Sequence, residues 1–392
     1  MSRSLEMQVV VIGGGPAGLV AGTLLAASGV PTVLVAPPAP ADTRTSALMQ
    51  SSLKVLERIG VWPALAPKTG ALKKLRLVDA SGGLIRAPET LFDAAELGLL
   101  AFGYNFENTI LLAALREAAG DFPHLAVFTS RVAAVEPGPD TVRVRLESGE
   151  NITARLAVGA DGRQSLCRAA AGIEARDRDY PQSALTLNFS HSRPHAGIST
   201  EFHRRGGPLV LVPLPGDRSS MVLVNTPEEI ARLDALGGAA LGRELEVLTH
   251  GLLGRITPDE ARGARPLGGL SVDTFAAHRI ALVGEAAHVL PPIGAQGLNL
   301  GIRDAAAIAE LASDAVASGR DPGVPEILAA YDKARHADAH PRQIAVDLLN
   351  RSLLTDFLPF DAARAAGLWA LASLPPLRRA VMRRGMALAA NH

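Results

Sequence analysis

The sequence predicts an α/β protein with two lobes. One is a Rossmann-like nucleotide-binding domain that carries an inserted β-hairpin region; the other is a smaller, mainly antiparallel β-sheet domain, and a C-terminal helical tail follows. The 392 residues exceed the roughly 250–300 at which a single core stops growing. A glycine-rich loop near the start joins a buried strand to a helix, and later short apolar runs, typical of buried strands, again end in small residues.

Composition excludes several classes of function. The 39 basic and 39 acidic residues cancel, and no basic stripe with interleaved aromatic residues marks a nucleic-acid binder. The single cysteine, Cys167, rules out an internal disulfide and fits a reducing, cytoplasmic compartment. His336 and His340 are spaced for a helical metal pair, but no third ligand accompanies them, so we expect no metal.

The first forty residues predict a βαβ unit. Residues 7–41 carry no charged side chain, but their glycines and prolines argue against a membrane span. We expect a buried strand at 9–12, a helix at 16–28 and a second buried strand at 32–35.

The loop between the first strand and the helix reads Gly13-x-Gly15-x-x-Gly18, which is typical of a dinucleotide site. The first glycine permits the tight turn, the second lets the backbone approach a pyrophosphate, and the third allows close packing of helix and strand. The acid that normally ends the second strand is missing, because Val35 is followed by Ala36 and prolines. An alternative is that Arg44 receives the extra phosphate of NADP, but that does not explain the later motifs.

Two later segments have the form of further cofactor loops. Strands predicted at 141–146 and 152–158 form a hairpin that leads into Gly159-Ala-Asp161-Gly, at the carboxyl end of a strand where ligands bind in open α/β sheets. A buried strand at 279–283 leads into Gly284-Glu-Ala-Ala-His288. The run Gly294-Ala-Gln-Gly-Leu-Asn299 then opens a helix that is expected to continue to Val316.

The middle of the chain predicts short strands at 184–189, 208–214 and 221–225, separated by turn residues. Helical stretches are expected near 228–236 and 241–253. This pattern indicates a mainly antiparallel sheet with helices that docks on the nucleotide domain.

Taken together, the motifs resemble those of the FAD-dependent aromatic hydroxylases, which are single-component flavin monooxygenases, and within them the ubiquinone-biosynthesis hydroxylases. The resemblance rests on the glycine loop and on the segments 42–48, 56–62, 104–108, 159–168 and 288–304. The run from Pro291 to Asp304 is the most specific of them.

The resemblance implies FAD as cofactor and a division of the chain into three parts. The FAD-binding domain would be discontinuous and comprise residues 1–70, 101–180 and 271–341. The substrate-binding domain would interrupt it at 71–100 and 181–270. A helical segment, 342–392, would end the chain. Glu285 stands where most members have Asp, and it would contact the ribityl chain. The cofactor-binding residues that the resemblance implies are Gly13, Gly15, Pro16, Ala17, Gly18, Arg44, Asn108, Val132, Asp161, Glu285, Gly297 and Leu298.

The resemblance also implies the chemistry. A reduced flavin would react with O2 to give a flavin hydroperoxide that hydroxylates an electron-rich ring, with electrons from NAD(P)H or a redox partner. No catalytic side chain is assigned. His288 would either sense or shuttle a proton or pack at the turn.

The tail from Arg342 onward holds seven Arg against three Asp together with many apolar residues. It predicts either a helical hairpin that packs on the lobes or a partner, or a peripheral contact with the cytoplasmic membrane. The segments 347–360 and 375–379 resemble the tail of ubiquinone-biosynthesis hydroxylases. The expected function is ring hydroxylation of a polyprenylated phenol or quinol in ubiquinone synthesis. Alternatives are a monooxygenase of a soluble aromatic or polyketide ring, and a non-catalytic FAD-binding subunit.

Overall fold

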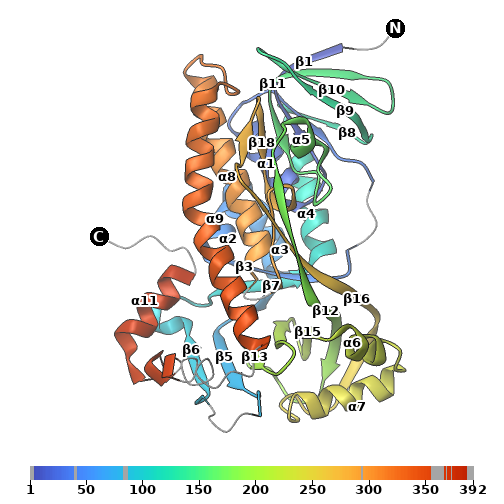
Figure 1. Cartoon of the computed structure of the whole chain (residues 1–392), viewed down its shortest axis with the longest axis vertical. Helices are drawn as coiled ribbons and strands as arrows, with labels where there is room; N and C mark the ends of the chain where they lie inside the picture. Colours follow the sequence, from blue (N-terminus) through green and yellow to red (C-terminus); the bar gives the residue numbers. More distant parts are fainter. Residues whose placement is uncertain are drawn as a thin grey trace.

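The structure is a computed structural model that describes residues 4–38, 42–82, 87–292, 295–354, 366–367, 369–371 and 373–385. Two large β-sheets dominate it, one in the upper and one in the lower half of Figure 1. Two long strands, β12 (Ala175–His191) and β16 (Ile256–Val272), pair with each other and descend into the lower sheet. The predicted α/β architecture of two lobes is confirmed.

The upper sheet has a parallel core of five strands. Its order is β17-β18-β11-β1-β2-β8, in which the neighbours from β18 to β8 run parallel. The predicted hairpin is present, because β10 pairs antiparallel with β11 and with β9. The strands are β1 Ser4–Ile12, β2 Thr32–Val35, β8 Leu125–Phe128, β9 Val132–Pro137, β10 Val142–Leu146, β11 Asn151–Gly159, β17 Ala276–Ala277 and β18 Ile280–Leu282.

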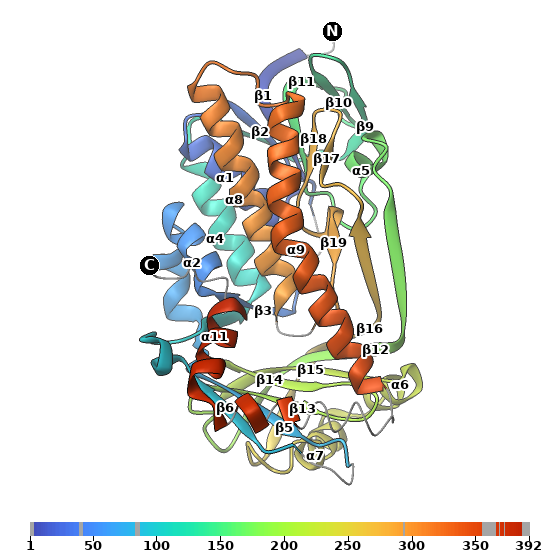
Figure 2. The same cartoon turned by 60° about the vertical axis from the view of Figure 1, so that its left-hand side comes forward.

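Helices cover this sheet on the face seen in Figure 2. Helix α1 (Pro16–Ala27) connects β1 to β2 and packs against α4 (Asn108–Gly120) and α8 (Gln296–Ala317). It begins with Pro16, whose missing N–H costs nothing in the first turn. Because neighbours surround it, α1 is apolar on nearly every side. Helix α9 (Pro325–Leu354) packs against α8.

The lower sheet has the order β19-β16-β12-β15-β14-β13-β5-β6 and is antiparallel except between β13 and β5. Alternate residues of β12, including Leu185, Leu187 and Phe189, point to one face and form a core with α6 and α7. The remaining elements of this lobe are β5 Lys74–Asp79, β6 Thr90–Asp93, β13 Ile198–His203, β14 Leu209–Leu214, β15 Arg218–Asn225, β19 His288–Val289, α6 Pro227–Asp234 and α7 Gly238–Leu248.

A small third sheet, β3-β7-β4, lies at the seam between the lobes. Asn105 of β7 is buried, and its amide donates to the carbonyl of Pro213 and to Ser220 Oγ, both at 3.1 Å, on strands of the lower sheet. The bounds are β3 Thr45–Met49, β4 Gly70–Ala71, β7 Gly103–Glu107, α2 Gln50–Arg58, α3 Trp62–Leu65, η1 Ala66–Lys68 and η2 Ala94–Leu97. Two further short elements lie elsewhere: α5 Leu166–Ala170 packs against β9, β11 and β18, and η3 Gly284–Ala286 packs against α8.

The predicted strand at 184–189 is much too short, and most of β16 was not predicted at all. Both strands have 17 residues. Their outer halves are polar and largely exposed, as at Arg176, Asp177 and Arg178, so they lack the apolar alternation that predicts a strand. The antiparallel backbone pairing between the two strands stabilises these outer halves instead.

The described part of the tail contains α11 (Pro375–Gly385), beside β6 in both views. Within the tail, residues 355–365, 368, 372 and 386–392 lie outside the described ranges, so the predicted alternatives of a helical hairpin and a membrane contact, and the resemblance over 355–360, fall partly on residues that the structure does not describe. Among the described helices, none combines the length and apolar character needed to cross a bilayer.

Candidate functional site

Three loops that are far apart in sequence meet at one edge of the upper sheet. Strands β1, β11 and β18 are adjacent and parallel, so the loops after Ile12, Gly159 and Leu282 leave the sheet together. Backbone hydrogen bonds join them, since Ala160 N–H donates to the Ile12 carbonyl at 2.7 Å and Val283 N–H donates to the Gly159 carbonyl at 2.9 Å. In open α/β sheets, ligands bind at this carboxyl edge.

The glycine loop has almost no room for side chains on the protein side. Gly13 has φ +124°, and a Cβ there would overlap the Ala160 carbonyl; a Cβ on Gly18 would overlap the Gly13 carbonyl. At Gly15, in contrast, a Cβ would meet no atom within 4 Å. The backbone at Gly15 is therefore open to a ligand at the N-terminus of α1, where free amides and the helix dipole favour phosphate.

Arg44 and Asn108 are brought together by Asp42. The Asp42 carboxylate accepts from Arg44 Nε at 2.7 Å and from Asn108 Nδ2 at 2.8 Å. Burial opposes ionisation of Asp42, but these hydrogen bonds lower its pKa to about 2. Asn108 Oδ1 is buried and has no hydrogen-bond partner among the described residues. A buried, unpaired amide oxygen marks a position where a donor is missing.

Asp161 is engaged by its own segment. Its carboxylate accepts from Ser165 Oγ at 2.6 Å and from the Cys167 N–H at 3.0 Å, so it fixes the start of α5. Arg168 of α5 then donates to the carbonyl of Ala286 at 2.9 Å, which ties the second cofactor loop to the third. Val132 begins β9, four residues beyond the end of β8.

Glu285 is the exposed residue of a buried turn. Gly284 has φ +61°, and a Cβ there would lie 3.2 Å from the Cβ of Ala17, so the turn sits directly against the start of α1. The hydrogen-bonded Asp42 carboxylate raises the pKa of Arg44, and the charge of Glu285 adds to this effect. The turn therefore presents one carboxylate beside the glycine loop.

The fourth segment begins α8. Gln296 starts the helix, and a Cβ on Gly297 would meet nothing within 4 Å. Asn299 is buried and holds this helix start against β3: its Oδ1 accepts from Met49 N–H at 2.9 Å, and its Nδ2 donates to the Ala47 carbonyl at 2.8 Å. The N–H groups of Gly297 and Leu298 belong to the first turn of α8, whose amides are free of helical partners.

Sequence reasoning missed Asp304, a fully buried carboxylate of α8. It accepts from the Gly284 N–H at 3.0 Å, His288 Nε2 at 2.6 Å and Arg335 Nε at 2.6 Å. Burial alone would raise the pKa of Asp304, but His288, Arg335 and the Gly284 amide hold the pKa below its usual value. His288 is thus part of a buried ionic network behind the turn. The signal in the sequence that could have identified Asp304 is that it is an acidic residue among the apolar, buried positions of the helix.

After β2, where the acid is absent, Ala36 lies against the glycine loop, because a Cβ on Gly14 would lie 2.8 Å from the Cβ of Ala36. Among the described residues, no group of three or more His, Cys, Asp or Glu side chains is arranged to hold a metal ion.

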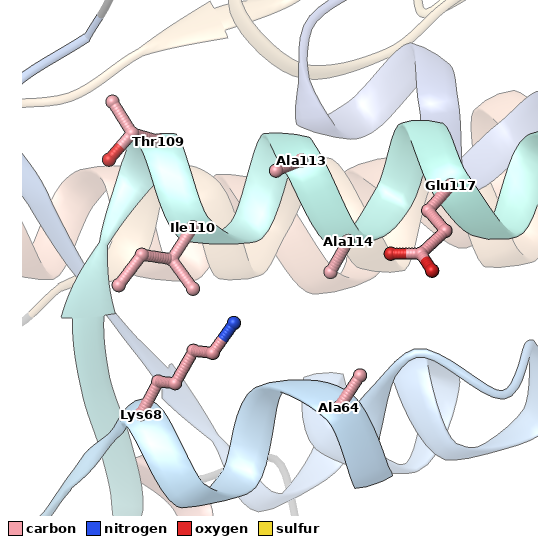
Figure 3. Close-up of a pocket in the computed structure, with 7 residues that line it drawn as sticks. All are labelled: Ala64, Lys68, Thr109, Ile110, Ala113, Ala114 and Glu117. Carbon is pink, nitrogen blue, oxygen red and sulfur yellow. The ribbon is translucent and has the colours of Figure 1, made fainter.

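A hollow of about 320 Å³ lies elsewhere, between α3–η1 and α4. Figure 3 shows Lys68 facing Ile110 at one end, Glu117 at the other end, and alanines between them. It contains none of the predicted cofactor residues.

Comparisons with known proteins agree with this geometry. Residues 6–343 match the family model described as an FAD binding domain. The chain is 35% identical to the ubiquinone hydroxylase UbiL of Rhodospirillum rubrum, over 96% of this chain and 89% of that protein. It is 29% identical to the 3-demethoxyubiquinol 3-hydroxylase of Escherichia coli, over 97% and 98%.

A solved structure supports the fold. The p-nitrophenol 4-monooxygenase PnpA of Pseudomonas putida DLL-E4 superimposes with a TM-score of 0.80 at 19% identity and covers 100% of both chains. The resemblance predicted from the motifs is therefore confirmed. This chain belongs to the FAD-binding-domain family and is one of its flavin-dependent monooxygenases.

Proposed function

We propose that this enzyme hydroxylates the aromatic ring of a polyprenylated phenol or quinol intermediate in ubiquinone biosynthesis. The main support is that a chain with three converging cofactor loops is 35% identical, over 96% of its length, to a protein named as a ubiquinone hydroxylase. FAD, once reduced by NAD(P)H or a redox partner, supplies the capacity to activate O2 for hydroxyl transfer.

The residues at the carboxyl edge fit FAD. In our proposal the open backbone at Gly15, with Gly13, Pro16, Ala17 and Gly18, binds the pyrophosphate at the N-terminus of α1. Arg44, oriented by Asp42, and the unpaired Oδ1 of Asn108 line the cofactor further along. In the same proposal, Glu285 binds the ribityl hydroxyls, the amides of Gly297 and Leu298 approach the flavin ring, and Val132 and Asp161 are further cofactor-binding residues.

The substrate-binding surface in this proposal is the face of the lower sheet opposite α6 and α7. Ser220 lies on that face, since it bonds to Asn105 of β7 while its neighbour Met221 packs toward the helices. In the next row across the sheet, Thr186, Val222 and Val210 are register neighbours and remain partly exposed. Their small, mostly apolar side chains suit an aromatic ring. Residues 71–100 and 181–270 form this substrate domain in the proposed division.

Cells that lack the gene are expected to accumulate an under-hydroxylated polyprenylated precursor and to lose ubiquinone. The measurement is a lipid-quinone profile by mass spectrometry, with the re-introduced gene as control. A normal profile would contradict the pathway. Substrate-stimulated oxidation of NAD(P)H by a water-soluble phenol, with no dependence on lipid, would identify a soluble aromatic substrate instead.

We further propose that the protein is cytoplasmic and peripheral to the inner face of the cytoplasmic membrane, with contact through the tail. Support comes from the exposed apolar side chains Trp369, Leu374, Leu377 and Val381. Met382, on another side of α11, is buried beside Phe92 of β6, and Arg378 pairs with Glu96 of η2 at 2.9 Å. These contacts attach α11 to the substrate domain, which a lipid-tailed substrate has to reach.

Replacing Val381 by Glu is expected to reduce the fraction of protein that floats with vesicles of phosphatidylcholine and phosphatidylglycerol, because burying a carboxylate in the interface is unfavourable. Val247→Glu is the matched control, since Val247 is an exposed valine of α7 in the substrate domain. Equal flotation of the two variants would refute a tail contact.

A further inference from the structure

Helix α9 reaches both of the turns that our proposed function assigns to the flavin, although it contributes no cofactor residue itself. We propose that Arg342 of α9 is a positioning residue: through Gln296 it holds the first turn of α8 in register with the Gly284–Glu285 turn. The proposal rests on the assignment of Glu285, Gly297 and Leu298 to the cofactor.

The connection begins at Asp304. Its carboxylate fixes the Gly284 amide and His288 on one side and Arg335 of α9 on the other. Arg335 also donates from Nη2 to Asp338 at 2.9 Å, one turn further along α9. The third cofactor loop is thereby bonded to α9 through one buried carboxylate and one guanidinium.

Asp338 extends the connection to the fourth segment. It accepts from Arg335, from Arg303 Nε of α8 at 2.7 Å and from Arg342 Nε at 3.0 Å. Burial opposes ionisation of Asp338, but Arg303 and Arg335 keep the pKa of its carboxyl well below its usual range. Arg342 Nη1 then donates to Gln296 Oε1 at 3.3 Å. Gln296 directly precedes the two residues whose amides we assign to the flavin ring.

The network is better suited to fixing geometry than to adding stability. Buried ion pairs recover little more than their desolvation cost, whereas they favour one arrangement of the groups they join. Helix α9 has independent anchors, because Tyr331 donates to the Leu282 carbonyl at 2.7 Å and Asp332 accepts from the Phe275 N–H at 2.6 Å. Loss of Arg342 therefore leaves α9 attached and leaves α8 bonded to β3 through Asn299, while Gln296 loses its bond to α9.

The test compares two Arg→Met variants at ion pairs of similar burial. The Arg342–Asp338 pair has side chains 16% and 22% exposed, and the Arg279–Asp321 pair has side chains 10% and 20% exposed. Arg279 also donates to the carbonyls of Pro139 and Arg155, so Arg279→Met removes at least as much structure, but away from the proposed flavin ring.

Arg342→Met is expected to raise the FAD dissociation constant of the apoprotein about tenfold, equivalent to about 1.4 kcal/mol, and to shift the visible flavin spectrum. Arg279→Met is expected to lower the apoprotein melting temperature without either effect. In a double-mutant cycle, Gln296→Met added to Arg342→Met is expected to produce a smaller loss than Gln296→Met alone, since the bond that the two residues share is already broken.

An unchanged FAD dissociation constant in Arg342→Met would overturn the proposal, as would an equal loss in Arg279→Met or an additive double variant. These measurements use FAD alone, without substrate or oxygen. Their outcome therefore tests the role of Arg342 independently of whether the enzyme hydroxylates a ubiquinone precursor.

Discussion

Replacing Asp304 by Ala is expected to lower the free energy of unfolding of the apoprotein by about 3–5 kcal/mol. The substitution removes one carboxylate that pairs with Arg335 and His288 and accepts from the Gly284 amide, all in a buried region. Arg335 is 5% exposed, so its charge would remain desolvated, with Asp338 as its remaining anionic partner among the described residues. Urea unfolding followed by circular dichroism measures the change.

Asp314→Ala is the matched control, because Asp314 lies on the same helix and is exposed. It is expected to change stability by no more than about 0.5 kcal/mol.

The pKa of Asp304 is lowered in the folded state, so the stability that Asp304 contributes is fully present above its unfolded pKa of about 3.9 and is lost as pH falls through the folded-state pKa. The difference in free energy of unfolding between wild type and Asp304→Ala is compared at pH 8 and at pH 6, which is on the order of two units above that window. A smaller difference at pH 6 than at pH 8 would contradict this account.

Gly15→Ala is expected to leave the fold intact and to weaken FAD binding about 100-fold, or about 2.7 kcal/mol. Gly15 has φ −75°, which alanine adopts freely, and its added methyl group would touch no protein atom. It would instead occupy the space through which the backbone approaches the pyrophosphate. Titration of the apoprotein with FAD by fluorescence, beside a thermal melt, separates affinity from stability.

Substitutions at two further glycines serve as comparisons for Gly15→Ala. Gly13→Ala is expected to abolish FAD binding and also to destabilise the apoprotein, because it combines a positive φ with overlap on the Ala160 carbonyl. Gly120→Ala, at the end of α4 with open space around it, is expected to alter neither property. Normal FAD affinity in Gly15→Ala would remove the glycine loop from the pyrophosphate site.

The first cofactor loop could be predicted from sequence because local rules determine it. A strand of consecutive apolar residues, three spaced glycines and a proline at the helix start each leave a pattern within about twenty residues. The structure has the second predicted strand at Thr32–Val35 and the helix at Pro16–Ala27. The loops after Gly159 and Leu282 could be recognised in the same way, since small residues follow each buried strand.

What could not be predicted depends on contacts between distant segments. Nothing near Asp304 in the sequence indicates that its partners are His288 and Arg335, because the pairing follows from how α8 packs against the η3 turn and α9. Asp161 was assigned to the cofactor by its motif, yet its carboxylate caps α5 through Ser165 and Cys167. The outer parts of β12 and β16 carry no apolar alternation, since each strand is stabilised by the other.

The sheet topology also determines when during synthesis the protein can acquire its cofactor. Strand β11 needs β1, about 150 residues earlier, and β18, more than 100 residues later, so the three loops coexist only after Leu282 has left the ribosome. Pairings of such large sequence separation form slowly. A nascent chain that stops before β18 therefore leaves the carboxyl end of β11 unpaired on one side and lacks one of the three cofactor loops. Such an exposed apolar edge is prone to aggregation, and this connectivity delays flavin loading until β18 has been synthesised.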